Sequence, residues 1–293
     1  MRINLLLIFG SLCGKIKFMR KEMIKKIRCA VLCALLTLSL CSCSVKEPEP
    51  VTEPPETTSN VVRVTFPEGT AISQAAMLLE ENGVCSAAEF MAAADDPTVL
   101  EGLPFIIEDY ENRPFIFEGY VFPDTYEFYR GENARTALKR FLKNADKKLD
   151  ESVKMRCDEL GYTVDEILTL ASIIQEEAGN PAEMGKVSSV IHNRLESSRF
   201  PKLQCDVATF YLRDYVKPYF DAAEYEGFID LYNTYNCEGL PEGPITNPGL
   251  DAINAALYPE ETDYYYFVTD SESNYYYAST WSEHLENCDI AGL

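Results

Sequence analysis

Apolar residues in the middle of the chain recur every three or four positions as far as Ile174, which is the spacing of one face of an α-helix. Thr163 and Glu166 form a capping box at the start of this pattern, and Gly179 and Pro181 are stop signals after it. The pattern therefore predicts an amphipathic helix that is delimited at both ends.

Two adjacent acidic residues close this predicted helix in different surroundings. At about 100° per residue, Glu177 lies on the apolar face near Ile173 and Ile174, whereas Glu176 turns toward the polar side. Burial and the negative end of the helix dipole both disfavour a carboxylate, so we expect a raised pKa for Glu177 and an ordinary, ionised Glu176. Glu177 is the candidate general acid. A structural carboxylate held in a salt bridge explains the helix pattern equally well.

The rest of the chain mixes helical spacing with the alternation typical of strands. The predicted elements are a strand at 61–66, helices at 71–82, 87–94, 133–154 and 186–195, and a final hairpin at 263–277. An acidic, aromatic stretch at 210–231 fits one wall of a cleft and a solvated helix pair equally well. We expect an α+β fold, with a small β/α module followed by a mixed helical domain that has short strands and a C-terminal hairpin.

The N-terminal segment differs from the rest. A basic stretch precedes an apolar run at 29–40 that is too short to span a bilayer comfortably, and the run leads into two cysteines. This order predicts a lipoprotein signal over residues 1–42. Cys43 is the expected lipid acceptor in preference to Cys41, because small Ser42 precedes it. An uncleaved amphipathic anchor is the alternative.

Residues 1–18 within this segment and residues 43–60 after it lack the pattern of a folded domain. Residues 1–18 fit poorly ahead of a basic stretch, so we expect translation to begin at Met19 or Met23. Residues 43–60 consist largely of Pro, Glu and Thr, which predicts a disordered tether.

Net charge argues against anionic partners. The whole chain has a formal net charge of −21, and its first 42 residues hold eight Lys or Arg and one acidic residue, so the remainder carries about −28. Such a charge repels phosphate backbones and anionic lipid headgroups, so we expect no nucleic-acid partner. Attachment to a membrane would depend on the lipid anchor.

Metal and cofactor chemistry has little support in the sequence. His192 and His284 are the only imidazoles, and no G-x-S-x-G motif accompanies them, so we expect no metal site, no Ser-His-Asp triad and no cofactor. His192 is interpreted as a packed or capping histidine. The cysteines after Cys43 are widely spaced, which favours free thiols, with a Cys205–Cys237 disulfide as the alternative.

Several motifs follow one another in a specific order. They are Glu118-Gly-x-x-x-Pro-Asp-Thr-Tyr126, Ala171-Ser-Ile-Ile-Gln-Glu-Glu-Ala178, Val190-Ile-His-Asn-Arg-Leu195, Leu203-Gln-Cys-Asp206, Tyr232-Asn-Thr-Tyr235, Gly239-Leu-Pro-Glu-Gly-Pro-Ile-Thr-Asn-Pro-Gly249 and Tyr264-Tyr-Tyr-Phe-Val-Thr-Asp270. Over residues 61–288 the ordered set resembles the YceG-like (MltG-type) family of endolytic lytic transglycosylases, which cut glycan strands of bacterial peptidoglycan. The resemblance implies a LysM-like module at 61–115 and a catalytic domain at 116–293. A merely structural β/α extension explains residues 61–115 as well.

The resemblance places the catalytic glutamate at Glu177, the residue that the helix pattern also selects. It implies that this residue protonates the leaving oxygen and that a 1,6-anhydro ring then closes on muramic acid. The candidates for orienting the sugar are Gln204, Asp206, Asn233, Thr234 and Tyr235. The implied partners are peptidoglycan strands and cell-wall synthases, outside the cytoplasm at the cell membrane.

The chain departs from the family pattern at two positions. Gln175 stands where many relatives have another carboxylate, which disfavours a paired-carboxylate mechanism inside the helix. Tyr275 stands where a family histidine is expected, and His284 remains. Two other functions stay open: a lysozyme-like muramidase in which Asp206 is the second carboxylate, and a non-catalytic peptidoglycan-binding scaffold in which Glu177 has no catalytic role.

Overall fold

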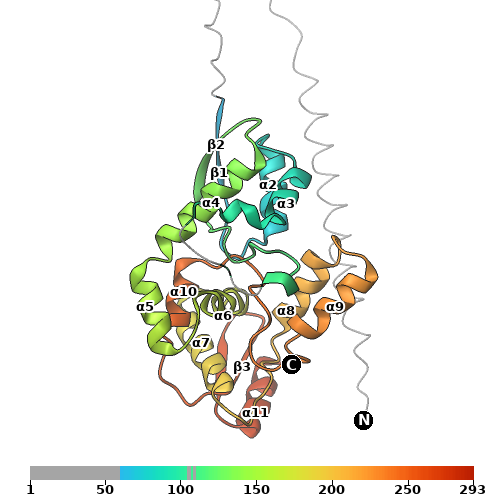
Figure 1. Cartoon of the computed structure of the whole chain (residues 1–293). Coiled ribbons are helices and arrows are strands. Elements are labelled where there is room, and N and C mark those ends of the chain that lie inside the picture. The colour runs from blue at the N-terminus through green and yellow to red at the C-terminus, as the bar shows by residue number, and fades with distance from the viewer. Residues whose placement is uncertain (1–59, 104–106, 108–109) are drawn as a thin grey trace, which may run out of the picture. The chain divides into compact units, whose positions relative to one another are not determined.

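A computed structural model describes residues 60–103, 107 and 110–293. The predicted signal segment, Cys43 and all but the last residue of the tether lie outside the described residues. Within the described part of the chain, no helix is long and apolar enough to cross a membrane. The elements in chain order (Figure 1) are β1 (Val61–Thr65), α2 (Ile72–Glu81), α3 (Ala87–Ala94), η1 (Pro97–Leu100), η2 (Tyr110–Asn112), β2 (Thr125–Tyr129), α4 (Ala134–Lys148), α5 (Glu151–Leu160), α6 (Val164–Glu177), α7 (Pro181–Leu195), α8 (Asp206–Tyr211), the π-helical turn η3 (Leu212–Val216), α9 (Ala222–Tyr232), α10 (Leu250–Leu257), β3 (Tyr266–Thr269), β4 (Tyr275–Ala278) and α11 (Trp281–Ala291).

A two-stranded sheet organises the N-terminal part, at the top of Figure 1. Strands β1 and β2 pair antiparallel, with Val61 opposite Tyr129 and Thr65 opposite Thr125. Helices α2 and α3 connect them, and α4 packs against α3. The predicted strand and the two helices after it are confirmed. Because β2 follows residue 115, this β/α group draws on residues from both sides of the expected domain boundary.

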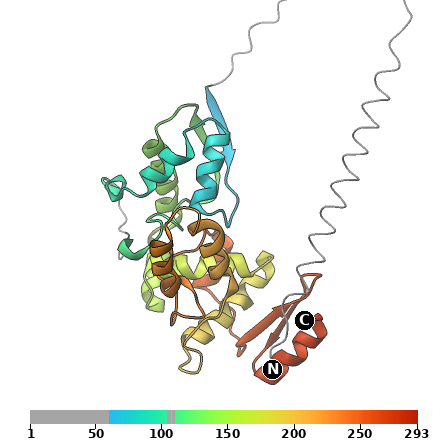
Figure 2. The same ribbon diagram turned by 90° about the vertical axis from the view of Figure 1, so that its right-hand side faces the viewer.

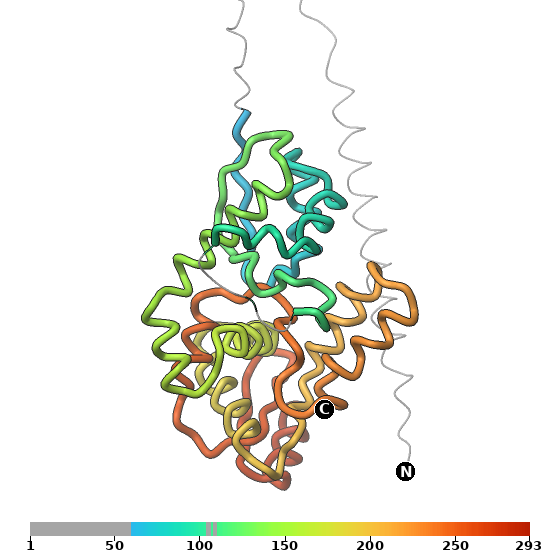
Figure 3. The backbone as a smooth tube through the Cα atoms, in the orientation of Figure 1, coloured from blue at the N-terminus to red at the C-terminus, as the bar shows by residue number. Residues whose placement is uncertain are grey.

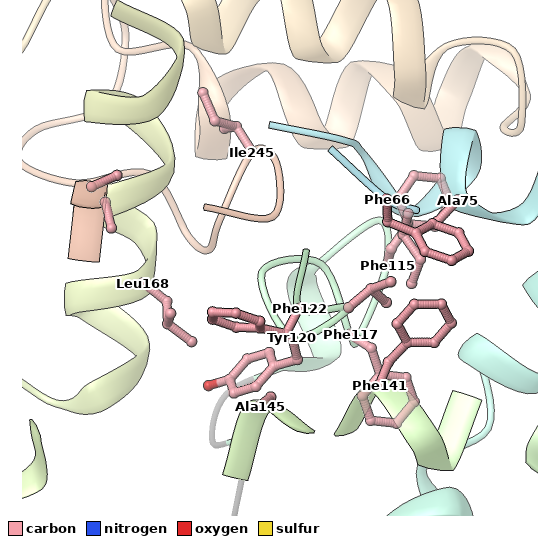
Figure 4. Packing of buried hydrophobic residues seen from close by; sticks show 14 of the residues in the cluster. Phe66, Ala75, Phe115, Phe117, Tyr120, Phe122, Phe141, Ala145, Leu168 and Ile245 are labelled. Carbon is pink, nitrogen blue, oxygen red and sulfur yellow. The ribbon is translucent and has the colours of Figure 1, made fainter. Parts of the chain in front are cut away.

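Aromatic rings fill the space between this sheet and its helices. The rings of Phe66 and Phe141 meet edge to face, with centroids 4.8 Å apart, and Phe90 and Phe128 contact Phe141 as well. Figure 4 shows Phe66 and Phe141 in a cluster that also includes Leu168 of α6. One hydrophobic core therefore joins the N-terminal group to the helical part that follows it.

The single helix predicted at 133–154 is wrong, because the chain forms two helices there. Helix α4 ends before Leu149, which is buried, and α5 begins after Asp150. The Asp150 carboxylate accepts hydrogen bonds from the backbone N–H groups of Ser152 and Val153, at 2.9 and 3.2 Å. Asp150 is thus an N-cap that starts a new helix.

Helix α6 occupies the centre of the helical part, as the tube in Figure 3 shows, and contacts α5, α7, α8 and α10. Its capping box forms as predicted: Thr163 Oγ1 accepts from the Glu166 N–H at 3.1 Å, and a Glu166 carboxylate oxygen accepts from the Thr163 N–H at 2.7 Å. All residues from Ile167 to Ile174 are buried. The helix therefore has exposed polar residues only near its two ends, and not along one whole face as expected. The core that surrounds its middle fixes the position of Glu177.

The predicted C-terminal hairpin is confirmed. Strands β3 and β4 pair antiparallel, with Tyr266 opposite Ala278, and the Asp270 N–H donates to the Asn274 carbonyl at 3.1 Å to close the turn. Helix α11 packs against both strands, and Figure 2 shows all three together in dark red. The stretch at 210–231 folds into short helices that bury Tyr211, so it is not wholly solvated.

A buried carboxyl group joins the N-terminal group to the loop before α10. Glu118 Oε1 accepts from the Ile72 N–H and from Asn247 Nδ2, each at 2.9 Å. Asn247 Nδ2 also donates to the Thr70 carbonyl at 2.7 Å, and its Oδ1 accepts from the Val121 N–H at 2.8 Å. Burial raises the pKa of Glu118 well above its usual value. These bonds give Glu118 and Asn247, from two of the sequence motifs, a structural role.

Candidate active site

Glu177 is the last residue of α6 and lies at a cavity of about 310 Å³. The polar groups around the cavity come from three parts of the chain: Arg194 from α7, Gln204 and Asp206 from the segment that leads into α8, and Tyr235 from the loop after α9. The fold thus brings together four motifs that are far apart in the sequence, and it places a carboxyl group where a ligand can reach it.

The predicted pKa shift of Glu177 is confirmed. Its pKa is raised to about 7, first by burial and then by the negative charge of Asp206, while Cys205 and Arg194 oppose the shift. Among the described residues, no salt bridge includes Glu177. The structural salt-bridge alternative therefore does not describe this residue, and a large share of its carboxyl groups carries a proton near neutral pH.

Glu176 was expected to be an ordinary surface carboxylate, and that expectation is wrong. The residue is exposed, but its carboxyl group lies against the loop that precedes α10: Thr246 Oγ1 donates to Glu176 Oε1 at 3.1 Å. On the other side, a Cβ added to Gly69 would lie 2.7 Å from Oε1. This partial desolvation raises the pKa of Glu176 above its usual value.

Two loops that carry candidate sugar-binding residues are joined by hydrogen bonds. Thr234 Oγ1 accepts from the Cys205 N–H at 2.9 Å and donates to the Cys205 carbonyl at 2.8 Å, and the Gln204 N–H donates to the Thr234 carbonyl at 3.1 Å. The Tyr235 hydroxyl donates to Asp206 Oδ1 at 2.8 Å. Thr234 is fully buried, so it fixes the position of the lining residues Gln204, Asp206 and Tyr235 from inside the loop.

Asn233 also acts inside its loop. It follows the last residue of α9, and its Oδ1 accepts from the Tyr235 N–H at 3.0 Å. Of the five candidate sugar-binding residues, the structure therefore brings Gln204, Asp206 and Tyr235 to the cavity, whereas Asn233 and Thr234 do not line it.

The two departures from the family pattern have structural roles near Glu177. Gln175 Oε1 accepts from the Gly249 N–H at 3.0 Å, at the N-cap of α10. The Tyr275 hydroxyl accepts from the Gly179 N–H at 2.6 Å and donates to the Glu177 carbonyl at 3.1 Å. Tyr275 thus satisfies a backbone carbonyl that the C-terminus of α6 leaves open, and it holds the backbone of Glu177 itself.

The interpretation of His192 as a packed histidine is confirmed: it is buried, and its Nε2 lies 2.9 Å from the Ala256 carbonyl oxygen. The five cysteines of the described residues are free, Cys205 and Cys237 included, so the disulfide alternative is wrong. Groups of three or more residues able to hold a metal ion are absent from the described part of the chain.

Several cavity residues were not assigned from the sequence. Arg194 donates from Nε to the Tyr265 carbonyl at 2.7 Å and from Nη1 to the Leu203 carbonyl. Aromatic residues from β3 and α11 complete the lining: Tyr266, Phe267, Trp281 and His284. Arg194 could have been found from the sequence, because it is a basic residue within one of the motifs of an acidic chain. The residues of α11 could not, because no local sequence pattern connects α11 with α6.

Comparison with known proteins agrees with this arrangement. Residues 49–290 match the model of the YceG-like family. The chain belongs to the YceG-like family. A crystal structure of a YceG-like protein from Listeria monocytogenes is 29% identical, with a TM-score of 0.65 over 76% of this chain and 74% of that chain. Family membership and the YceG-like fold therefore rest on sequence and structure together.

Two similar proteins carry a functional name. Proteins called endolytic murein transglycosylase from Bacillus subtilis strain 168 and Streptococcus pneumoniae D39 are 33% and 30% identical to this chain. The matches cover 78% and 76% of this chain but 64% and 43% of those proteins. The chain thus spans less than two thirds of the length of each.

Proposed function

We propose that this protein is an endolytic lytic transglycosylase that cleaves the bond between N-acetylmuramic acid and N-acetylglucosamine inside peptidoglycan strands. The observation that carries the proposal is the place of the Glu177 carboxyl group, whose pKa is raised to about 7 chiefly by burial, at a cavity with polar and aromatic walls. The name shared by the two similar proteins supports the substrate class and the reaction.

One carboxyl group suffices for this reaction. In the first step Glu177 donates its proton to the glycosidic oxygen as the bond from that oxygen to C1 breaks, and positive charge develops at C1 and the ring oxygen. In the second step the Glu177 carboxylate accepts the proton of the C6 hydroxyl of muramic acid, and the oxygen of that hydroxyl bonds to C1. A 1,6-anhydro ring forms, Glu177 regains its proton, and no water is consumed. The attack is intramolecular and gains from proximity.

The other polar groups orient the sugar and balance the charge. We assign direct contact with the glycan to Gln204, Asp206 and Tyr235, because they line the cavity with Glu177. The negative charge of Asp206 would stabilise the positive charge that develops at C1. Asn233 and Thr234 would act through the loop that they hold in place.

We further propose the setting of the reaction. A lipid on Cys43 would hold the protein at the outer face of the cell membrane, the tether would let the domain reach the wall, and the β/α group around β1 and β2 would serve as a LysM-like module. Cell-wall synthases would supply the nascent strands. Metabolic labelling with a fatty-acid analogue tests the anchor: label should be lost in Cys43→Ala, and label that survives there but disappears in Cys41→Ala would move the site to Cys41.

A muramidase is the second candidate, because Asp206 places another carboxyl group at the same cavity. Mass spectrometry of muropeptides after incubation with purified protein separates the candidates. We expect 1,6-anhydromuramic ends from internal cleavage. New reducing ends would support the muramidase, and the absence of new ends would support a binding scaffold.

A further inference from the structure

Trp281 is a large side chain at the edge of the Glu177 cavity with no role in the core. It is the first residue of α11, a helix none of whose residues is buried, and it is 56% exposed. The hydroxyl of Thr280 caps the helix by accepting from the Glu283 N–H at 3.3 Å. The local backbone is therefore fixed, and the indole faces solvent at a wall of the cavity.

Two neighbouring rings hold the indole in place. The centroid of Trp281 lies 5.7 Å from that of Tyr266 and 5.3 Å from that of His284. Tyr266 and His284 stack on each other, with centroids 5.1 Å apart and planes inclined by 20°. The guanidinium of Arg194 lies 5.4 Å from the Tyr266 ring centre. Ring contacts thus hold this group together, and we name it the aromatic corner (Tyr266, Trp281 and His284).

The charge of the protein limits how it can bind an anionic glycan. The chain has a formal net charge of −21, whereas muramic acid and its peptide bring further carboxylates. Long-range electrostatics therefore oppose binding. Uncharged contacts are not weakened by this repulsion, and the apolar C–H face of a pyranose ring on an aromatic face is such a contact.

We propose that the aromatic corner is a sugar-binding subsite in which Trp281 stacks on a pyranose ring of the glycan strand beside the bond at Glu177. The inference rests on the proposed function and deepens it. The polar residues of the cavity would bind the hydroxyl and acetamido groups of the sugars, while the indole covers one face of a ring. Trp281 and Glu177 line the same cavity. A sugar ring on the indole would therefore lie beside a glycosidic bond held at Glu177.

The chain offers a direct test, because Trp281 is its only tryptophan. Soluble, peptide-free strands of alternating N-acetylglucosamine and N-acetylmuramic acid are titrated into full-length Glu177→Gln, which prevents turnover, while tryptophan emission is recorded. Stacking should give a saturable change in intensity and a shift to shorter wavelength. Calorimetry with the same strands gives the dissociation constant independently.

Variants in the Glu177→Gln background give the size of the contribution. Calorimetry should show binding about tenfold weaker in Trp281→Ala and about threefold weaker in Trp281→Phe, which keeps a smaller aromatic face. The matched control is Tyr258→Ala: Tyr258 is 60% exposed and does not line the cavity, so its removal should leave binding unchanged. Circular dichroism verifies the fold of each variant.

Three results would overturn the subsite. They are an emission spectrum that stays unchanged while calorimetry shows binding, a Trp281→Ala variant that binds as tightly as its parent, and an equal loss in Tyr258→Ala. Failure of the proposed function itself has a different signature, namely the absence of anhydro ends after incubation with the unsubstituted protein.

Discussion

Glu118 and Glu177 are both carboxyl groups whose pKa is raised chiefly by burial, but they occupy different regions. Glu118 is 2% exposed and accepts hydrogen bonds from the Ile72 N–H and the Asn247 side chain. It lies where the N-terminal group contacts the loop before α10. Glu177 opens onto a cavity. A raised pKa therefore does not identify a general acid. Glu177 differs from Glu118 because a ligand can reach its carboxyl group and because polar and aromatic groups surround it.

The largest expected effect is the loss of catalysis in Glu177→Gln, which keeps the shape of the side chain and removes the transferable proton. We expect release of anhydro-muropeptides to fall at least about 10³-fold, within the range of general acid–base catalysis. Glu118→Gln is the matched control and should retain activity near that of the parent, because its proton has no route to a substrate. Similar losses in both folded variants would remove the distinction between the two regions.

The next effect concerns stability, for which Glu118 rather than Glu177 is the more important of the two residues. Glu118→Ala leaves the Ile72 N–H and the Asn247 amide without their acceptor and opens a void, so we expect the free energy of unfolding to fall by about 3 kcal/mol. Glu118→Gln keeps a neutral acceptor in place and should cost less than about 1 kcal/mol. Urea unfolding followed by circular dichroism measures both. Equal losses of unfolding free energy in the two variants would show that the hydrogen bonds accepted by Glu118 Oε1 do not stabilise this contact region.

A smaller effect should follow from loosening the backbone of Glu177. Tyr275→Phe removes the hydroxyl that contacts the Glu177 carbonyl and the Gly179 N–H but keeps the ring. We expect kcat to fall about tenfold with little change in KM, because the proposed acid is displaced while the candidate sugar-binding residues stay in place.

Tyr276→Phe is the control for this prediction, since its hydroxyl donates to Asp270 in the hairpin turn. Steady-state kinetics on soluble glycan strands separates the two parameters. A loss confined to KM, or an equal loss of kcat in Tyr276→Phe, would rule out a positioning role for Tyr275.

The smallest effect is a shift of the pH profile. The proposed mechanism requires protonated Glu177, so the rate should fall as pH rises through its pKa of about 7. Asp206→Asn removes a negative charge that raises this pKa, and the alkaline limb should move to lower pH by a fraction of a unit. Glu176→Gln should move it less and be nearly silent in rate, because Glu176 raises the pKa of Glu177 less than Asp206 does.

A positive charge near Glu177 should lower the same pKa. Ile173 is fully buried, however, so a lysine at that position would test the fold rather than the acid. The pH dependence of kcat/KM in Asp206→Asn is therefore the informative measurement. A limb that does not move in this folded variant would show that another group titrates.

The predictable parts of the molecule depend on neighbours in sequence. The capping box at Thr163, the periodicity that predicts a raised pKa for Glu177 and the turn after Asp270 are local signals, and each of these features is confirmed. The catalytic role of Glu177 stays a prediction. The N-cap at Asp150 was also a local signal, but the continuing apolar pattern obscured it. Family resemblance, rather than periodicity, indicated the loops at Gln204 and Tyr235.

The remaining features depend on contacts across the fold. The bond from Thr246 to Glu176 and the exposed position of Trp281 at the cavity arise from segments far apart in the chain. No spacing rule connects such segments, because tertiary packing decides which surfaces meet. Burial of the whole middle of α6 has the same origin, since the helices around it cover the face that the sequence pattern left polar.

The state of the Glu177 carboxyl group can be measured without any substrate. Nuclear magnetic resonance of protein labelled at the glutamate carboxyl carbons, recorded across the pH range for the parent and for Glu177→Gln, assigns the Glu177 signal by difference. The account predicts a midpoint at about 7 for this signal. A midpoint near the ordinary value of 4.5 would contradict it, because Glu177 would then be ionised at neutral pH and would have no proton to donate.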